Sequence, residues 1–158
     1  MPDHVIRLPI LSRRIHGQEV FEIEPTLIVK TVAGANVCLP FLFDTGTHFT
    51  TIPISMANDL GIRYATHDPV GIRGATGVAK GYMAPVWFSF SSLPQLQFES
   101  FCCFSTYELT RPLLSLTDVI RHFAMQTLLP SKIYPFGSLA LKLGKQHRGY
   151  RDEPVAHR

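Results

Sequence analysis

Short apolar runs separated by glycine and proline extend along most of this chain, a pattern typical of many short β-strands. Several runs are rich in β-branched residues, which favour extended backbone. Residues 13–17 break the first of them. The predicted strands are residues 5–11, 21–24, 26–32, 37–43, 50–53, 82–90, 96–104, 113–116 and 139–143. The predicted fold class is therefore all-β.

Three other segments have a different pattern. Residues 54–60 predict a short helix that ends at Gly61, because glycine readily adopts the left-handed backbone found at helix C-termini. Residues 118–125 predict a second short helix, for which Thr117 supplies a hydroxyl as N-cap. Residues 70–81 are glycine-rich and lie between extended segments, so they predict a long flexible hairpin.

Length and charge limit the function classes that fit. The chain has 158 residues, enough for one domain with a hydrophobic core, and 46% of them are hydrophobic. The net charge of +3 is small and the basic residues are scattered, apart from Arg13-Arg14 and the C-terminal tail. Nothing therefore indicates a nucleic-acid partner. No stretch approaches the roughly 20 apolar residues that a membrane span needs, so no membrane association is expected.

Cysteine and histidine usage is informative in the same way. Cys38, Cys102 and Cys103 are odd in number and form no C-x-x-C pair, which favours reduced thiols in an intracellular protein. The seven histidines show no metal-binding spacing, so neither a metal nor another cofactor is expected. The first residues carry charge and proline where a secretory signal is apolar, which favours a cytoplasmic location.

The most informative segment is residues 42–48, Leu-Phe-Asp-Thr-Gly-Thr-His, which places the carboxylate of Asp44 on a tight turn after an apolar run. An Asp-Thr-Gly triplet in this context resembles the active-site loop of aspartic proteases, and it occurs once in the chain. The glycine-rich hairpin and the segment 113–120 follow in the order found in retropepsins, the single-domain aspartic proteases. The resemblance spans residues 25–143.

The resemblance implies a retropepsin-like closed, orthogonal β-barrel with one short C-terminal helix and a flap hairpin. It divides the chain into an N-terminal arm of residues 1–24, a protease domain of residues 25–143 and a polar tail of residues 144–158. It also implies two carboxylates that share one proton, because like charges at contact distance do not both ionise. One such loop is half an active site, so the implied partner is a second copy. Asp44 of each copy would then meet on a two-fold axis.

The family pattern also assigns individual roles. Asp44 activates the water that attacks the peptide bond, Thr45 holds the two loops together across the dimer, and Gly46 permits their close approach. The hydroxyl of Thr47 is expected to hydrogen-bond the carboxylate, which favours a lower pH optimum. The expected catalytic residues are Asp44, Thr45 and Gly46, and the residues expected to bind a peptide or protein substrate are Thr47, His48 and, in the flap, Gly71, Ile72, Arg73, Gly74 and Ala75.

The third segment departs from the family pattern, which has a glycine after two aliphatic residues, then an arginine or another polar residue, and then Asp or Asn. Leu116 occupies the glycine position, or Ser115 does with one residue inserted, and Thr117 stands in place of the arginine. That arginine supports the active-site loop in the family, and this sequence lacks it at that position. His48 has three interpretations: it lines a substrate subsite, replaces the missing support, or is a structural hydrogen-bonding residue.

Two other functions fit the same sequence. A catalytically silent dimer of the same fold would bind extended peptides without cleaving them, and acid-favoured cleavage that depends on Asp44 separates it from an enzyme. An unrelated small β-barrel binding protein would be a monomer in which the Asp-Thr-Gly triplet is an ordinary turn. The favoured interpretation is a homodimeric aspartic endopeptidase that acts without a covalent intermediate.

Overall fold

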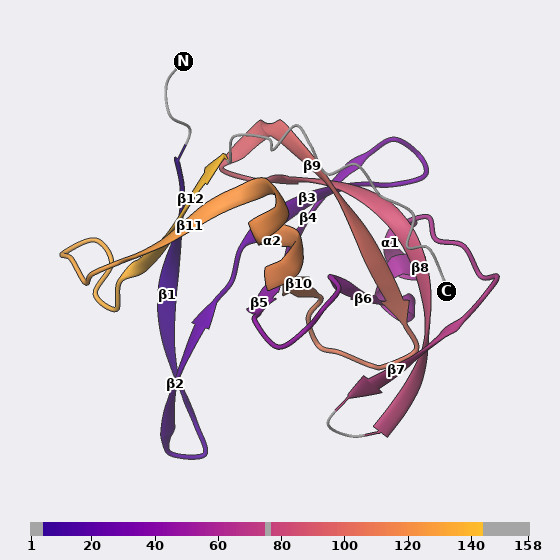
Figure 1. Cartoon of the computed structure of the whole chain (residues 1–158), viewed down its shortest axis with the longest axis horizontal. Coiled ribbons are helices and arrows are strands. Elements are labelled where there is room, and N and C mark those ends of the chain that lie inside the picture. The colour runs from indigo at the N-terminus through magenta and orange to yellow at the C-terminus, as the bar shows by residue number, and fades with distance from the viewer. Residues whose placement is uncertain (1–4, 75–76, 144–158) are drawn as a thin grey trace, which may run out of the picture.

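The computed structural model describes residues 5–74 and 77–143, which form two β-sheets and two short helices (Figure 1). The strands are β1 (Val5–Ile15), β2 (Gln18–Ile23), β3 (Thr26–Lys30), β4 (Asn36–Pro40), β5 (Leu42–Asp44), β6 (Thr51–Pro53), β7 (Val70–Gly74), β8 (Gly77–Phe90), β9 (Leu93–Ser105), β10 (Leu113–Ser115), β11 (Phe123–Leu128) and β12 (Ser138–Leu143). The helices are α1 (Ile54–Leu60) and α2 (Leu116–His122). The predicted all-β class is confirmed.

The larger sheet has the strand order β4-β3-β8-β9-β6-β10-β5, and β7 pairs with β8 outside this path. Most neighbours are antiparallel, but β5 runs parallel to β10 and β6 runs parallel to β9. A parallel pair needs a crossover connection rather than a tight turn, so segments far apart in sequence meet at these two places. One of them is the end of β5, where Asp44 lies.

Aromatic side chains fill the core beneath the long hairpin of β8 and β9. Side chains of β8 alternate as far as Phe88, with Val86 and Phe88 buried and Trp87 exposed between them, and Phe90 is buried as well. Phe90 stacks on Phe98 with ring centroids 5.6 Å apart, and Phe123 stands edge-on to both at 5.5 Å. Such arrangements add about 0.5–1.5 kcal/mol per pair to the burial of the rings themselves. The hairpin therefore packs on the C-terminal part of the chain.

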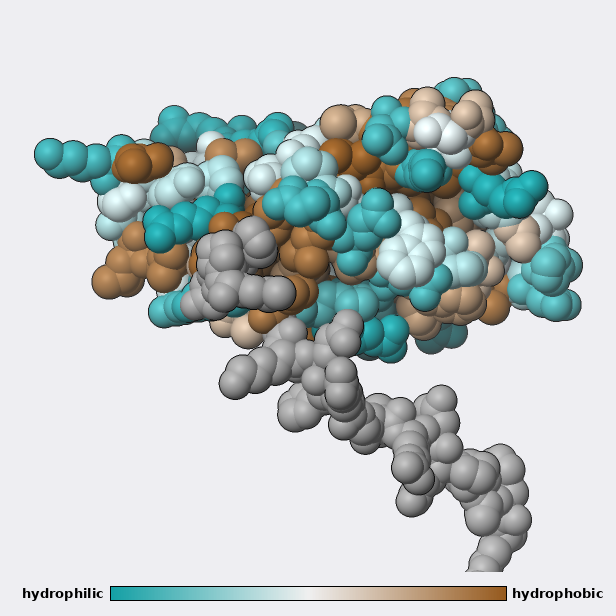
Figure 2. Space-filling model, turned by 90° about the horizontal axis from the view of Figure 1, so that it is seen from above, coloured by the Kyte–Doolittle hydropathy of each residue, from teal (hydrophilic) through white to brown (hydrophobic). Residues whose placement is uncertain are grey.

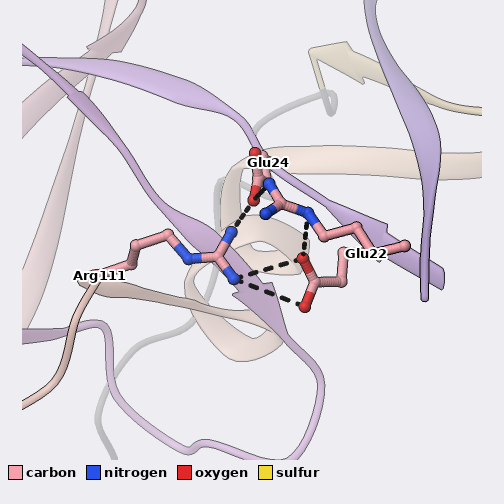
Figure 3. A network of polar contacts seen from close by, with 4 residues as sticks. Glu22, Glu24 and Arg111 are labelled. Carbon is pink, nitrogen blue, oxygen red and sulfur yellow. Dashed lines mark hydrogen bonds and ion pairs between the residues drawn. The ribbon is translucent and has the colours of Figure 1, made fainter. Parts of the chain in front are cut away.

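The smaller sheet has the order β11-β12-β1-β2 and joins both ends of the described chain (Figure 1). An ion cluster attaches it to the larger sheet, and its members are Arg13, Glu22, Glu24 and Arg111. Arg111, which lies just before β10, contacts Glu22 at 3.3 Å and also contacts Glu24 (Figure 3). Arg13 Nε lies 3.1 Å from Glu22. The ion cluster thus connects the β1–β2 hairpin to the segment that leads into β10.

Helix α1 and its end at Gly61 agree with the sequence prediction. Gly61 has φ of 65° and its backbone N–H donates to carbonyls of the last turn, as expected for a left-handed C-cap. The predicted break at residues 13–17 is wrong for its first part, because β1 continues to Ile15. That extension occurs because β1 pairs with β2 along its whole second half, with Ile15 opposite Gln18.

The second predicted helix is placed incorrectly. The helix is α2, Leu116–His122, and its N-cap is Ser115 instead of Thr117, because the Ser115 hydroxyl accepts the Thr117 N–H at 3.0 Å. The chain then becomes extended as β11, which was missed in the sequence. Strand β11 pairs with β12 at six consecutive positions, and Phe123 at its start is buried. Pairing with β12 and burial of Phe123 outweigh any local preference for helix.

Apolar side chains are not confined to the core. Figure 2 shows hydrophobic surface at the end of the molecule that carries the β11–β12 hairpin, and more across the middle of this face. The connection between these strands holds three exposed apolar residues, Leu129, Ile133 and Phe136. Among the helices of the described residues, neither is long and apolar enough to cross a membrane.

Candidate active site

Asp44 is the last residue of β5, and its position follows from the packing of that strand. Phe41, just before β5, is fully buried, as is Leu114 in the middle of β10. The parallel register sets Leu114 beside Phe43 and Ser115 beside Asp44. The apolar strand β5 is partly buried, and Asp44 is its last residue, where the chain leaves the sheet. Asp44 is therefore only half-buried.

The turn after Asp44 binds the carboxylate from its own backbone. The Gly46 N–H donates to Asp44 Oδ1 at 2.7 Å, an Asx-type turn. A Cβ added at Gly46 would lie 3.3 Å from the same oxygen, which is tight and favours glycine here. Thr45 and Gly46 are exposed, so this turn faces solvent in a single copy. The predicted hydrogen bond from Thr47 to the carboxylate is absent, because its hydroxyl donates to the Asp44 backbone carbonyl at 3.3 Å.

The residue that ends the turn segment is held by hydrogen bonds to three other elements. We use "Asp44 loop" for residues 44–50, and its last residue, Thr50, is fully buried. Thr50 donates both its backbone N–H and its hydroxyl to Asp118 Oδ2, at 3.0 and 2.6 Å. The Thr50 hydroxyl accepts the Ser115 N–H at 3.2 Å, and the Thr50 carbonyl accepts the Cys103 N–H at 2.8 Å. The four hydrogen-bonding contacts fix Thr50 to β10, α2 and β9.

A second hydrogen bond holds the middle of the Asp44 loop. The Ser115 hydroxyl donates to the Thr47 carbonyl at 3.0 Å while it accepts the Thr117 N–H. Ser115 is therefore both the N-cap of α2 and a contact to the loop. The sequence offered Ser115 only as one of two candidates for a family glycine. It placed Asp118 in the segment that resembles the family and at the start of a predicted helix, with no contact to Thr50. The separation of 68 residues between Thr50 and Asp118 explains why no local pattern revealed the pair.

The side chain that replaces the family arginine makes no comparable contact. Thr117 contributes its backbone N–H to Ser115, and no side-chain hydrogen bond of Thr117 occurs among the described residues. His48 is exposed, and it makes no side-chain hydrogen bond or ion pair with any residue that the structure describes. The loop is supported instead by Ser115, Thr50 and Asp118. No contact in the described residues therefore supports two of the three interpretations of His48, the structural hydrogen-bonding role and the replacement for the missing arginine.

Two cysteines lie beside the buried end of the loop. Burial raises the pKa of the Cys102 thiol far above its usual range, and the charge of nearby Asp118 adds to this rise. Burial also raises the pKa of Cys103 to about 11. Both thiols are therefore protonated at neutral pH and are poor nucleophiles. They are core residues rather than catalytic ones.

The glycine-rich hairpin forms as predicted, from β7 and the start of β8. Gly71 and Arg73 are exposed, Ile72 is half-buried, and Gly74 lies opposite Gly77 at the end of the described pairing. Ala75 lies outside the described residues. At the base of the hairpin a Cβ on Gly81 would lie 2.6 Å from Cys103 Sγ, so glycine is needed there for close packing. This constraint was not visible in the sequence.

A large hollow lies elsewhere on the molecule. Its volume is about 640 Å³, and Lys30, Arg63, Trp87 and Gln97 are among the residues that line it. None of the predicted site residues lines this hollow.

Comparisons with known proteins agree with this geometry. The model of the aspartyl protease family matches residues 29–104, a segment that contains the Asp44 loop and the β7–β8 hairpin. A comparison with curated proteins gave no match.

Two solved structures are similar to this chain. One is a retropepsin-like aspartic protease from Rickettsia conorii, 16% identical, with a TM-score of 0.56 over 90% of this chain and 95% of that chain. The other is the EIAV protease in complex with the inhibitor HBY-793, 21% identical, with a TM-score of 0.44 over 58% of this chain and 81% of that chain. The first likeness shows that the fold is retropepsin-like.

Proposed function

We propose that this chain, whose fold is retropepsin-like and part of which matches the aspartyl protease family model, is a homodimeric endopeptidase whose two Asp44 carboxylates form one active site. The observation that carries the proposal is the Asp44 loop. It presents one half-buried carboxylate, bound by the Gly46 N–H, on a turn that is otherwise exposed. The sequence contains this triplet once, so we assign the second carboxylate of the pair to another copy of the chain.

The chemistry follows from the pairing of the two carboxylates. Two like charges at contact distance do not both ionise, so the pair holds one proton across the acidic range. The ionised Asp44 takes a proton from a water between the two chains while the protonated Asp44 donates to the carbonyl oxygen of the peptide. The water oxygen bonds to the carbonyl carbon, and the tetrahedral intermediate then collapses with proton transfer to the leaving amine.

Substrate binding is assigned to the surfaces next to this loop. We propose that the β7–β8 hairpin closes over an extended peptide and binds it by backbone hydrogen bonds, with Gly71, Ile72, Arg73 and Gly74 as the contributing residues. The exposure of Gly71 and Arg73 supports this assignment. Thr47 and His48 follow the Asp-Thr-Gly triplet directly and are assigned to substrate binding. Thr45 is assigned to the contact between the two loops. A cytoplasmic location remains a prediction.

The experiment is a digest of a fluorescent peptide pool from pH 3 to pH 7, with a sizing column run on each protein. Wild type is compared with Asp44→Asn, which keeps the shape of the side chain but removes the shared proton. The control is Asp59→Asn, the same change on the exposed surface of α1. The proposal is supported if cleavage is faster at acidic pH, if the activity elutes with the dimer, and if Asp44→Asn abolishes it while Asp59→Asn does not.

Other outcomes contradict it in different ways. A stable dimer without cleavage at any pH makes the protein a catalytically silent peptide-binding module. Cleavage that survives in Asp44→Asn places the catalytic group elsewhere. A monomer that cleaves peptides contradicts the shared site.

A further inference from the structure

Asp118 has an unusual environment for a carboxylate. Among the acidic residues that the structure describes it alone is buried, with 2% of its surface exposed. No ion pair in the described ranges includes it. Burial of a carboxylate is costly unless hydrogen bonds replace its water. Within the described residues, the side-chain hydrogen bonds that the Asp118 carboxylate accepts come from Thr50, the last residue of the Asp44 loop.

The geometry of these contacts is that of a strong attachment. A single oxygen, Asp118 Oδ2, accepts both the backbone N–H and the hydroxyl of Thr50. The hydroxyl contact of 2.6 Å is in the range of charge-assisted O–H···O⁻ bonds, which are shorter and stronger than neutral ones. Because Thr50 is fully buried, loss of Asp118 would leave two donors without partners and without water.

The attachment reaches Asp44 through a short path. Thr50 ends the loop that begins at Asp44, and its hydroxyl also accepts the Ser115 N–H. Ser115 lies beside Asp44 in the parallel pair of β10 and β5, and its own hydroxyl binds the Thr47 carbonyl. The start of α2 therefore holds the loop at its middle and at its end. No arginine takes part in this arrangement.

We infer that Asp118 is a positioning residue that fixes the Asp44 loop through Thr50 and thereby sets the orientation of the catalytic carboxylate. The inference rests on the proposed function, because the test that uses kcat requires the protein to be a peptidase. Asp118 does not touch substrate and acts only through the loop. A misplacement of about 1 Å in a catalytic group lowers the rate on the order of 100-fold, so a loose loop affects the chemical step more than peptide binding.

The test compares Asp118→Ala, Asp118→Asn and the control Asp59→Ala, an equivalent change on exposed α1. We expect kcat of Asp118→Ala to fall on the order of 10- to 100-fold, with KM within about 3-fold of wild type. Asp118→Asn retains an oxygen that accepts both Thr50 donors, so it is expected to recover most of kcat. Asp59→Ala is expected to match wild type.

A second measurement does not depend on cleavage. Hydrogen exchange of the Thr50 amide reports whether its hydrogen bond to Asp118 has opened. We expect this exchange to accelerate at least about 10-fold in Asp118→Ala, to stay slow in Asp118→Asn, and to be unchanged in Asp59→Ala. If Asp118→Ala does not fold, the pair Thr50→Val and Thr50→Ser replaces it, since valine removes the hydroxyl and serine keeps it.

The outcomes separate the two hypotheses. If wild type cleaves no peptide, the proposed function fails, and the exchange data still decide whether Asp118 holds the loop. The inference is overturned if folded Asp118→Ala keeps the kcat of wild type, even at a lower melting temperature. It is also overturned if only KM changes, or if exchange at Thr50 is unaffected.

Discussion

The ion cluster offers a quantitative test of how the two sheets are held together. Arg111, in the segment before β10, contacts Glu22 in β2 and Glu24 directly after β2 (Figure 3). Arg111→Met removes the guanidinium and keeps most of the apolar side chain. The change therefore isolates the charge contacts from the packing of the side-chain stem. It is expected to loosen the smaller sheet from the barrel.

The magnitude follows from how exposed these groups are. The side chains of Arg111, Glu22 and Glu24 are 27%, 12% and 17% exposed. Exposed ion pairs contribute up to about 1 kcal/mol, and removal of one partner from a buried pair costs about 3–5 kcal/mol. Arg13 remains to pair with both glutamates in the variant. We therefore expect a loss of about 2 kcal/mol in the free energy of unfolding, or about 4–8 °C in melting temperature.

The assay is urea unfolding of wild type, Arg111→Met, Glu24→Gln and the double variant, at low salt and in 1 M NaCl. Arg14→Met is the control, because Arg14 lies on β1, is exposed and has no ion pair among the described residues. A coupling energy of about 1 kcal/mol or more between Arg111 and Glu24 is expected, with a smaller value at high salt. A loss below about 0.5 kcal/mol, or two additive single variants, would show that the ion cluster does not hold the sheets together.

Two further predictions concern the base of the hairpin and the buried thiols. Gly81→Ala places a Cβ against Ile72 and Cys103, so thermal unfolding should show a loss of about 1–3 kcal/mol. Gly71→Ala, whose Cβ would lie at an ordinary contact distance of 4.0 Å from Val78 Cγ1, should lose less than half of that. The pKa of Cys103 is raised from 9.0 to about 11, so the folded chain keeps this proton at a pH where the unfolded chain loses it. The contribution of Cys103 to stability should therefore be complete below pH 9 and fall by up to about 1.4 kcal/mol per pH unit above it. Urea midpoints from pH 8 to pH 10.5 measure this slope, and a slope unchanged in Cys103→Ala would contradict it.

Much of the fold could be predicted from local pattern. The apolar run before Asp44, the glycine-rich hairpin and the glycine at the end of α1 each place a structural signal within a few residues of its effect. The second helix was misplaced because residues 123–128 are an uncharged apolar and polar mixture that fits either a helix or a strand. Their partner, β12, lies beyond a loop, and only the folded chain shows the pairing.

The support of the candidate site was out of reach for a different reason. Thr50 and Asp118 are 68 residues apart, and Arg111 and Glu22 are 89 residues apart. The position of Asp118 at a helix start predicts a favourable interaction with the helix dipole. The residues next to it in sequence do not indicate a contact with a distant loop. The position of Asp44 was predictable because one short motif contains the carboxylate, the turn and the glycine. The contacts that hold that motif depend on tertiary packing.

The shared active site is best examined by subunit mixing. Wild type and Asp44→Asn are combined at equal concentrations, allowed to exchange subunits, and assayed at the total protein concentration of a wild-type reference. If each site needs Asp44 from both copies, only pairs of wild-type chains cleave, so activity falls to about a quarter of the reference. Activity that stays at about half of the reference would mean that each chain acts with its own carboxylate, and the homodimeric mechanism would be wrong.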